Sequence, residues 1–558
     1  MARSVKKMSV NNPTSGSSEL TMSLFAPGMS PLHRAGLGGL ACTLKFIERE
    51  VRAGRLKERQ TPGAPWHGGK PPWDISPITV TLRFGKPENA KEFLRRLFGI
   101  AFALEDGLIW TPGAYPDVPP TLPVRALLQQ GITLSFLQHG RVRSLAKTET
   151  VYDYQPEGEE GKTLQVEYKK CSFYKHQDGW KDLVDPRGRL KAEPIEVVGP
   201  ISPGAVVRHG AFTGNTKIQE DAAHVLPLYF ALVGCLALPI NRGSGVLVIP
   251  EVDDLLRFCR VRPEMTPQTV RDCQIGNASD AALQAQLRVR LKQVVHDNEL
   301  PGCHGVEFRP MPWSTQQKSR ARAVFVAPGA EGQLELFAAV MQEEALSPRI
   351  VERRVVETPG RRKRKEKEEG RKTEWFWADS IVRPLVADNL ASGRRWYEGF
   401  VRLMIQVDPV SKRPIRERLF FEKKGLHAMI QTCAWQDRGE GAVVRAVHEA
   451  MRRRFAQIAD ENKNNPVARK NRWKGEYDRW RLAFAGAKTG DQFRHSLCDL
   501  LSRAGINPVL QNEWQQVLPL LAGNQWHLAR DLALLALASY TGTGAEDATQ
   551  SAATDNLQ

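Results

Sequence analysis

The sequence has no membrane-spanning run, no paired cysteines and no secretory signal. Its most apolar stretch, from Val225 to Ile240, contains two prolines and falls short of the roughly 18 residues that a membrane span needs. The eight cysteines include no Cys-x-x-Cys pair, which argues against zinc ribbons and against a secreted disulfide scaffold. Lys6 and Lys7 are followed by serine, asparagine and glycine in place of an apolar signal core. We therefore expect a cytoplasmic protein.

The common catalytic motifs are also missing. The chain contains no Gly-x-x-x-x-Gly-Lys-Ser/Thr, no Gly-x-Ser-x-Gly and no His-Glu-x-x-His. The nearest acidic clusters are Asp253-Asp254 and the run from His296 to Glu299, and neither has a second carboxylate at a recognisable spacing. A helix N-terminus and a solvated loop explain them more simply. We predict a protein that is not an enzyme and has no catalytic residue, metal site or cofactor.

Positive charge, in contrast, is abundant. The chain carries 79 Lys and Arg against 62 Asp and Glu, a net charge of +17. Such an excess favours a polyanionic partner, and composition alone leaves RNA, DNA and an acidic membrane open.

The residue patterns predict an α+β protein with a large mixed N-terminal body and a C-terminal helical bundle. The segment PGRRKRKEKEEGRKT, from Pro359 to Thr373, separates two stretches of different periodicity. We expect a disordered leader at 1–22, the body at 23–358, a flexible charged linker at 359–374, the bundle at 375–540 and a disordered tail at 541–558.

Three glycines mark the first helix of the body. Ser30 followed by Pro31 is typical of an N-cap with proline at the first helical position. Gly36, Gly38 and Gly39 then lie inside this helix, where each costs about 1 kcal/mol relative to alanine. We expect a second backbone to pack closely against them.

Alternating and helical apolar patterns predict the other elements of the body. Strands are expected at Ile78–Phe84, Leu164–Tyr168 and Val246–Ile249, and helices after Asn89 and from Ala281 to Val295. A hairpin is expected in which 324–326 and 334–336 flank a turn at 328–332.

After the charged segment the apolar period changes to about 3.6 residues. Helices are expected over 444–458, over 493–504 with an end at Gly505, and over 526–540. The last of these is apolar almost all round and should lie in the middle of the bundle. The many tryptophans of this half are more simply core residues than base-stacking platforms.

Two glycine-containing polar loops are candidates for reading bases. One spans 208–217 and the other 241–245, at opposite ends of a buried apolar segment. Glycines allow a backbone to approach a groove closely, and short polar side chains can then reach base edges. The candidate motif-reading residues are Asn215, Thr216, Lys217, Asn241, Arg242 and Ser244.

The bundle is a candidate for binding a nucleic-acid backbone. It holds 26 Lys and Arg against 17 Asp and Glu between Trp375 and Tyr540. Cations on an exposed helical face neutralise phosphates without reading sequence. The candidate residues are Arg445, Arg452, Arg453, Arg454, Lys470 and Arg472.

Both ends of the chain resemble one known family. The opening from Ser23 to Leu40 (SLFAPGMSPLHRAGLGGL) is similar to the start of the large subunit of type I CRISPR Cascade, the eighth Cas family, in the myxobacterial-type branch of subtype I-B. The residues around Phe493, Trp514 and 526–540 (WHLARDLALLALASY) are similar to its end.

The resemblance implies a non-catalytic DNA-recognition subunit of an RNA-guided ribonucleoprotein complex for antiviral defence. Its partners would be crRNA, target double-stranded DNA, the displaced strand, the handle-binding, backbone and small subunits, and a helicase–nuclease, with no membrane. Such a subunit reads a protospacer-adjacent motif, opens the duplex and holds the displaced strand in the R-loop. His33 and Arg34, within the matching opening, become candidates for contact with the crRNA handle or a neighbouring subunit.

Alternatives remain at this point. The same subunit could serve a transposon-associated complex, with a transposition protein in place of the nuclease, or the chain could be a nuclease or recombinase that uses Asp253 and Asp254. The resemblance also implies that an internal start codon can produce a separate small subunit. Met404, Met429 and Met451 are candidates, and Met404 is favoured because it keeps most of the bundle.

Overall fold

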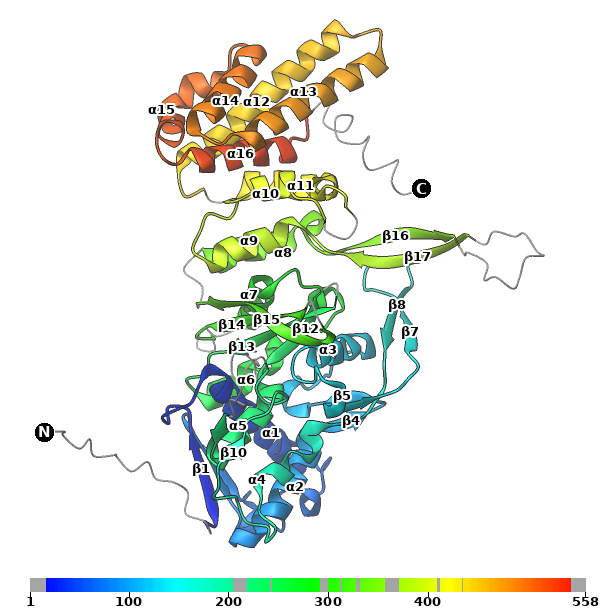
Figure 1. Ribbon diagram of the computed structural model, residues 1–558, viewed down its shortest axis with the longest axis vertical. Coiled ribbons are helices and arrows are strands. Elements are labelled where there is room, and N and C mark those ends of the chain that lie inside the picture. The colour runs from blue at the N-terminus through cyan, green and yellow to red at the C-terminus, as the bar shows by residue number, and fades with distance from the viewer. Residues whose placement is uncertain are drawn as a thin grey trace, which may run out of the picture. The chain divides into compact units, whose positions relative to one another are not determined.

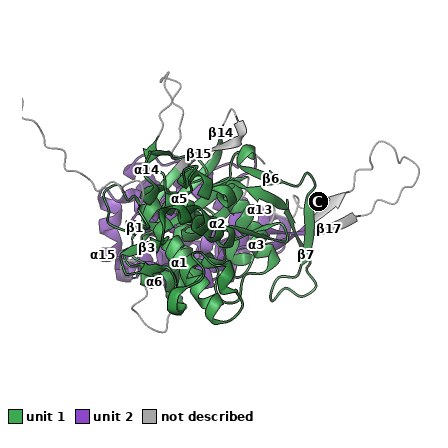
Figure 2. Cartoon of the chain, turned by 90° about the horizontal axis from the view of Figure 1, so that it is seen from below, with its two compact units in different colours: residues 1–329 green, residues 330–558 purple. Residues whose placement is uncertain are grey.

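The computed structural model describes residues 17–203, 218–240, 243–291, 300–311, 314–327, 332–356, 371–408, 412–433 and 435–542. Contacts divide the chain into two compact units, Met1–Gly329 and Ala330–Gln558 (Figure 2). Unit 1 mixes helices with small sheets and unit 2 is mainly helical, which confirms the predicted α+β class (Figure 1). No helix among the described residues is long and apolar enough to cross a membrane.

Unit 1 contains one four-stranded sheet, one three-stranded sheet and several strand pairs. Its helices are α1 (Pro31–Arg52), α2 (Ala90–Ala101), α3 (Leu122–Leu134), α4 (Trp180–Leu183), α5 (Ala222–Gly234), α6 (Leu255–Val261) and α7 (Ala278–Leu291). Its strands are β1 (Glu19–Ser23), β2 (Trp73–Ile75), β3 (Thr79–Arg83), β4 (Ala103–Glu105), β5 (Leu108–Trp110), β6 (Arg143–Leu145), β7 (Thr150–Tyr154), β8 (Leu164–Tyr168), β9 (Cys171–Tyr174), β10 (Ile195–Glu196), β11 (Gln219–Glu220), β12 (Leu236–Ile240), β13 (Ser244–Pro250), β14 (Cys303–Met311) and β15 (Ser314–Val326).

The sheets of unit 1 are antiparallel. The four-stranded sheet has the order β12-β13-β14-β15 and the three-stranded sheet the order β1-β3-β2. Strand β13 is buried along its whole length, as its run of valine, leucine and isoleucine predicts. The predicted strands at 78–84, 164–168 and 246–249 are confirmed as β3, β8 and part of β13.

Helices α1 and α5 pack backbone against backbone. A Cβ atom added at Gly36 would lie 1.9 Å from the Pro227 carbonyl oxygen, and one at Gly39 would lie 2.3 Å from the Phe230 carbonyl oxygen. From the other helix, a Cβ at Gly234 would lie 1.8 Å from the Ala35 carbonyl oxygen. Only glycine fits at these positions, which confirms the predicted close approach of a second backbone at Gly36 and Gly39. At Gly38 the prediction is wrong, because the three atoms nearest to a Cβ there, the first at 2.4 Å, all belong to the Phe258 side chain of α6 and not to a backbone.

The C-terminal end of α5 is held by a buried arginine. The Arg262 guanidinium donates to the carbonyl oxygens of Val233 at 2.7 Å, Cys235 at 2.8 Å and Ala114 at 3.2 Å. The carbonyls of Val233 and Cys235 lie at the C-terminal end of α5 and carry the negative end of its helix dipole, so they stabilise a cation there. Arg262 also donates to the Thr266 hydroxyl oxygen at 2.9 Å, and burial lowers its pKa from the usual value.

The predicted hairpin at 324–336 is wrong. Strand β15 ends at Val326 and pairs with β14, whereas Leu334 to Leu336 lie in helix α8 (Gln333–Gln342). The longer spacing explains the difference: Leu334, Phe337 and Val340 recur every third residue and are buried along one helical face. A window of three residues could not distinguish this period from a strand. The helix predicted from Ala281 to Val295 is α7, in which Leu291 is exposed, and residues 292–295 lie outside the described residues.

Unit 2 contains one strand pair and a stack of helices. The strands are β16 (Arg349–Val356) and β17 (Arg371–Ala378). The helices after α8 are α9 (Val382–Ala391), α10 (Val401–Ile405), α11 (Leu419–Thr432), α12 (Arg438–Glu461), α13 (Pro466–Gly486), α14 (Gly490–Ala504), α15 (Pro508–Ala522) and α16 (Trp526–Ser539). Helix α16 is buried along nearly its whole length, and Gly505, with φ of 80°, ends α14, both as predicted.

The charged segment connects two paired strands. Residues 371–374 of the expected linker belong to β17, which runs antiparallel to β16 from Arg349↔Ala378 to Val356↔Arg371. Residues 357–370, which include most of the expected linker, lie outside the described residues. The division between the two compact units falls earlier in the chain, between Gly329 and Ala330.

Two buried carboxylates in unit 2 cap helices that are remote from them in sequence. Glu422 of α11 accepts from the backbone N–H groups of Ile381 and Val382 at 2.8 and 3.1 Å, at the start of α9. Asp531 of α16 accepts from Gly399 N–H at 2.7 Å and Val401 N–H at 3.2 Å, at the start of α10. Burial raises the pKa of both carboxyl groups, and the N–H donors oppose this shift. The two contacts fasten α9 to α11 and α10 to α16.

An unpartnered histidine lies in the core of unit 1. The ring of His176 is fully buried among Phe102, Phe136, Tyr174 and Tyr229. Neither of its nitrogens has a hydrogen-bond partner among the described residues. Burial lowers the pKa of His176 from 6.5 to about 3, so the imidazole is neutral at physiological pH.

The α1–α5 crossing predicts a position-dependent cost of adding one methyl group. Gly39→Ala should lower the free energy of unfolding by about 1 to 3 kcal/mol or more, because the new Cβ meets backbone atoms that cannot move aside. Gly99→Ala in α2 is the matched control, since a Cβ there meets no atom within 4 Å. The control should stabilise by up to about 1 kcal/mol. Equal thermal unfolding curves for the two variants would contradict the close approach.

His176 predicts a pH dependence of stability. Between pH 6.5 and about 3 the unfolded chain binds a proton that the folded chain excludes, so the free energy of unfolding falls as the pH is lowered. His176→Phe removes this effect, and the stability difference between variant and parent should grow by up to about 1.4 kcal/mol per pH unit across that window. Denaturant unfolding at several pH values measures it. Parallel profiles for the two proteins would show that His176 does not titrate in this way.

Candidate nucleic-acid interface

The first helix begins with a chain of polar contacts. The Ser30 N–H donates to Nδ1 of His33 at 3.3 Å, so Nδ1 is an acceptor and the ring proton lies on Nε2. Nε2 then donates to the Glu220 carboxylate at 2.7 Å. His33 is therefore buried and already satisfied on both nitrogens, and it ties the start of α1 to β11.

Arg34 belongs to a second ion-pair cluster. Its guanidinium lies 2.9 Å from Glu251, which also accepts from Nε2 of His304 at 2.5 Å. Glu251 directly follows β13, so Arg34 fastens α1 to the end of the four-stranded sheet. Arg34 remains partly exposed, and contact with a crRNA handle or neighbouring subunit by His33 or Arg34 stays a prediction.

A histidine between two hydrogen-bond acceptors lies at the start of α5. The Nδ1 atom of His224 is 2.9 Å from the Asp221 carboxylate, and Nε2 is 3.0 Å from the Pro27 carbonyl oxygen. Both partners can only accept, so both ring nitrogens must donate, as in the imidazolium form. The Asp221 hydrogen bond raises the pKa of His224 accordingly. His224 lies seven residues after Lys217, at which the first predicted polar loop ends.

The two predicted polar loops lie mostly outside the described residues. This applies to Asn215, Thr216, Lys217, Asn241 and Arg242. Ser244 is described: it is the first residue of β13, pairs with Ile240 and is 8% exposed. Ile240 and Ser244 thus bring the ends of the 241–243 segment together, whereas Glu220, after the other loop, pairs with Ile195.

The acidic pair considered for catalysis has local partners. Asp254 is the N-cap of α6, where its side chain accepts from the Arg257 N–H at 2.7 Å. Asp253 forms an ion pair with the Arg257 guanidinium. No group of three His, Cys, Asp or Glu side chains that could hold a metal occurs in the described part of the chain, and the run from His296 to Glu299 falls outside it.

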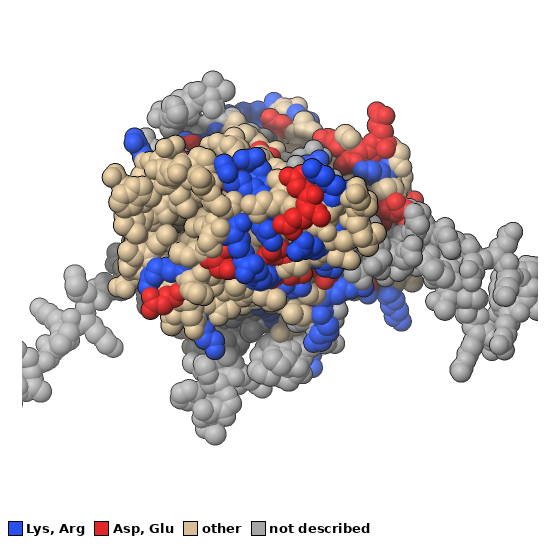
Figure 3. All heavy atoms as spheres, turned by 90° about the horizontal axis from the view of Figure 1, so that it is seen from above, with Lys and Arg blue, Asp and Glu red and all other residues tan. Residues whose placement is uncertain are grey.

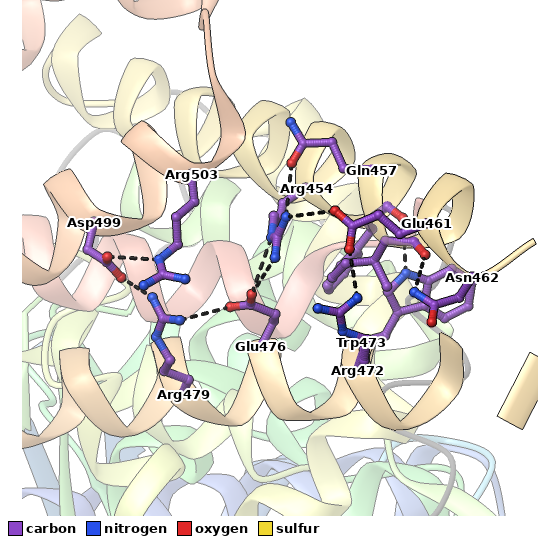
Figure 4. A network of polar contacts seen from close by, with 12 residues as sticks. Arg454, Gln457, Glu461, Asn462, Arg472, Trp473, Glu476, Arg479, Asp499 and Arg503 are labelled. Atoms are coloured by element: carbon purple, nitrogen blue, oxygen red, sulfur yellow. Dashed lines mark hydrogen bonds and ion pairs between the residues drawn. The ribbon is translucent and has the colours of Figure 1, made fainter. Parts of the chain in front are cut away.

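A ladder of alternating charges joins three helices of the bundle (Figure 4). The ion-pair ladder runs in order through Arg503, Asp499, Arg479, Glu476, Arg454, Glu461 and Arg472. Arg503 and Asp499 come from α14, the next two from α13, Arg454 and Glu461 from α12, and Arg472 from α13 again. Each carboxylate lies between two guanidinium groups, so the ladder links the helices. Its four arginines and three carboxylates leave a net charge of +1.

Arg454 lies at the centre of this ladder. Its guanidinium is 2.9 Å from Glu476 and 3.7 Å from Glu461, and the side chain is only 15% exposed. It also donates to the Gln457 amide oxygen at 3.1 Å. Arg454 therefore connects α12 to α13 from a mostly buried position. Replacing it would leave the carboxylates of Glu476 and Glu461 without one of their arginine partners.

Arg452 and Arg453 are arranged differently. Both lie one turn after Glu449 on α12 and donate to its carboxylate, at 2.8 and 2.6 Å. The Arg452 hydrogen bond is the main reason why the pKa of Glu449 falls to about 2, so one carboxylate is shared by two cations. Arg452 is 60% exposed, and such surface ion pairs are worth about 0 to 1 kcal/mol. A phosphate could replace Glu449 at Arg452 with little loss.

The remaining candidates also lie on the bundle surface. Arg445 pairs with Glu513 of α15 at 2.5 Å, and Arg472 pairs with Glu461 at 2.7 Å. Lys470 lies on α13, two residues before Arg472. Trp473 and Trp480 of the same helix are buried, and Trp473 donates to the Phe455 carbonyl oxygen at 3.0 Å, in agreement with the predicted core role. For Trp514 the core prediction is wrong, because this side chain is 51% exposed.

The contrast between Arg452 and Arg454 predicts separable effects. Arg454→Gln should destabilise the protein by about 1 to 3 kcal/mol because it breaks the ladder. Arg452→Gln should change stability by less than about 0.5 kcal/mol, yet lower the salt slope of double-stranded DNA binding by about one unit. Thermal unfolding and filter binding over a salt series measure the two effects. An unchanged slope in Arg452→Gln would remove this residue from the interface.

Comparisons with known proteins identify the family. The model of the DevT N-terminal domain matches residues 21–229, which include α1 and the first half of α5, and the model of the DevT C-terminal domain matches residues 431–558, which include α12 to α16. The CRISPR-associated protein Cas8a1/Csx13 of Myxococcus xanthus is 35% identical, over 95% of this chain and 90% of that protein. The chain therefore belongs to the DevT family of Cas8-type CRISPR-associated proteins.

Proposed function

We propose that this protein is the non-catalytic large subunit of a type I-B CRISPR surveillance complex of the myxobacterial-type branch. The observation that carries the proposal is the similarity to a Cas8-type protein along nearly the whole chain. The net charge of +17 suits a subunit that contacts crRNA and target DNA. In such a complex, base pairing with the guide reads the target while the protein reads a short motif and the nucleic-acid backbone.

Unit 1 is proposed to read the protospacer-adjacent motif and to help open the duplex. The described residues on either side of its polar loops are firmly held: Ile240 pairs with Ser244, and Glu220 is bonded to both Ile195 and His33. Rigid flanks reduce the entropy lost when a loop enters a groove, which favours specific contacts.

Unit 2 is proposed to hold the displaced strand through phosphate contacts. Its exposed arginines sit in weak surface ion pairs, of which Arg452 and Arg453 with their shared Glu449 are the most cationic. Exchange of such a carboxylate for a phosphate keeps the charge balance and releases counterions from the nucleic acid. This arrangement favours binding that depends on salt and not on sequence. The handle-binding, backbone and small subunits and a helicase–nuclease complete the proposed set of partners.

The polar loops give the test of this function. In the purified crRNA-loaded complex, Lys217→Ala or Asn241→Ala should weaken binding to motif-bearing duplex by about 1 to 3 kcal/mol, the usual value of a direct base contact. Binding to single strands complementary to the guide should change far less, because no motif is read there. Electrophoretic titration with both substrates measures the two losses.

Lys86→Ala, at an exposed lysine of unit 1 remote in sequence from both loops, is the control for charge alone. It should affect both substrates equally and slightly. Equal losses on duplex and single strand in the Lys217 and Asn241 variants would mean that these residues support the fold and do not read the motif.

A further inference from the structure

One side of unit 2 has almost no charge. From Ile506 to Gln525 the chain contains a single charged residue in 20, Glu513, where an overall charged fraction of 25% would give about five. Helix α15 fills most of this stretch and presents glutamine, asparagine, tryptophan and leucine side chains to solvent. In the view from above, the left part of the surface, where α15 lies, is tan almost throughout, whereas charged side chains gather toward the middle (Figure 3).

The helix is held rigidly by its inner side. A Cβ at Gly439 of α12 would lie 2.2 Å from the Gln516 carbonyl oxygen, so the two backbones nearly touch. Asn507 caps α15 and donates to the Ala446 carbonyl oxygen at 2.8 Å. Val517 and Leu520 are buried against the bundle. The charge of Glu513 is taken up by Arg445.

The outer side of α15 carries large apolar side chains that are exposed to solvent. Trp514 is 51% exposed and Leu518, one helical turn further on, is 49% exposed, while Ile506 protrudes just before the helix. The amides of Gln511 and Gln515 lie beside them on the exposed side. A tryptophan and a leucine ringed by neutral hydrogen-bonding groups are typical of the anchor and rim of a protein interface.

Nucleic acid does not suit this surface. No lysine or arginine lies between Ile506 and Gln525. The arginines that reach α15 from other helices, Arg445 and Arg494, are already paired with Glu513 and Asp491, so this helix itself offers no cation to a phosphate backbone. A second copy of the chain does not suit it as a stable partner either. A helix of 15 residues is about 22 Å long, and one face about 10 Å wide supplies only some 200 to 300 Å², against roughly 800 Å² per partner in a stable complex.

We propose that the outer face of α15, centred on Trp514 and Leu518, docks a resident protein subunit of the same RNA-guided complex through an uncharged apolar surface. The small area is sufficient when the partner is already held near by the rest of the assembly, because the second contact is then effectively intramolecular. The identity of the complex rests on the proposed function. The contact should be insensitive to salt, in contrast to the arginine-rich side of the bundle.

Hydroxyl-radical footprinting with mass spectrometry tests the occupant. The assembled complex without DNA should show several-fold less oxidation of Trp514 than the isolated chain, at both about 0.1 M and about 0.5 M salt. Leu482 of α13, exposed on the same unit, is the internal control and should be oxidised equally in both samples. Unprotected Trp514 in the assembled complex would overturn the proposal. Protection of Trp514 in the isolated chain by added duplex DNA would assign the face to nucleic acid and overturn the proposal. Protection of Trp514 when the concentration of the isolated chain is raised would assign the face to a second copy and overturn the proposal as well.

A double variant measures the contribution to assembly. Trp514→Ser with Leu518→Ser should lose a protein subunit from the complex after dilution, as seen by native mass spectrometry, while retaining crRNA. The matched control is Leu482→Ser with Val467→Ser, which removes two other exposed apolar side chains of unit 2. Thermal unfolding of the isolated chain confirms that both variants remain folded. Full subunit content in the Trp514 variant would overturn the proposal, whereas failure of the unaltered complex to bind target DNA would count against the proposed function alone.

Discussion

The backbone contact between α1 and α5 is the constraint on which unit 1 depends. Gly36 and Gly39 on one helix and Gly234 on the other leave no space for a Cβ atom. Because the helices approach so closely, the polar groups at their starts also meet, and His33 reaches Glu220 while His224 reaches Pro27. Arg262 and Arg34 then fasten the pair to other parts of the unit. The proposed motif-reading loops are attached to this frame.

Unit 2 shows that net charge and available charge are different quantities. Its arginine excess is real, yet the ion-pair ladder uses four of these arginines to join α12, α13 and α14. Carboxylates perform the matching task inside the unit, where Glu422 and Asp531 cap helices that are remote in sequence. Arg452, with its shared carboxylate and high exposure, is the type of cation that remains open to a phosphate. The uncharged face of α15 then gives the unit a second kind of surface, suited to protein.

Local patterns predicted much of the fold. The proline after Ser30, the alternation around Val80 and Leu82 and the apolar run of α16 each placed an element correctly, because each reports burial within a few neighbouring residues. The hairpin at 324–336 failed since three residues cannot distinguish the two periods. For the candidate sites, the sequence placed His33, Arg34 and the arginines of α12 on the right elements, but could not show which carboxylates face them.

The sequence by itself determined the α+β class, the glycine-bearing helix that a second backbone approaches, the excess of cations in the second half and the low charge of the stretch from Ile506 to Gln525. These properties are additive over neighbouring residues, so they can be read along the chain. Only the tertiary structure decided which helix meets the glycines, which arginines are neutralised and which side of α15 stays uncovered. Each of these depends on distances between atoms that are far apart in sequence, such as Arg454 and Glu476 or Gly439 and Gln516, and pairwise contacts of that kind leave no local signal.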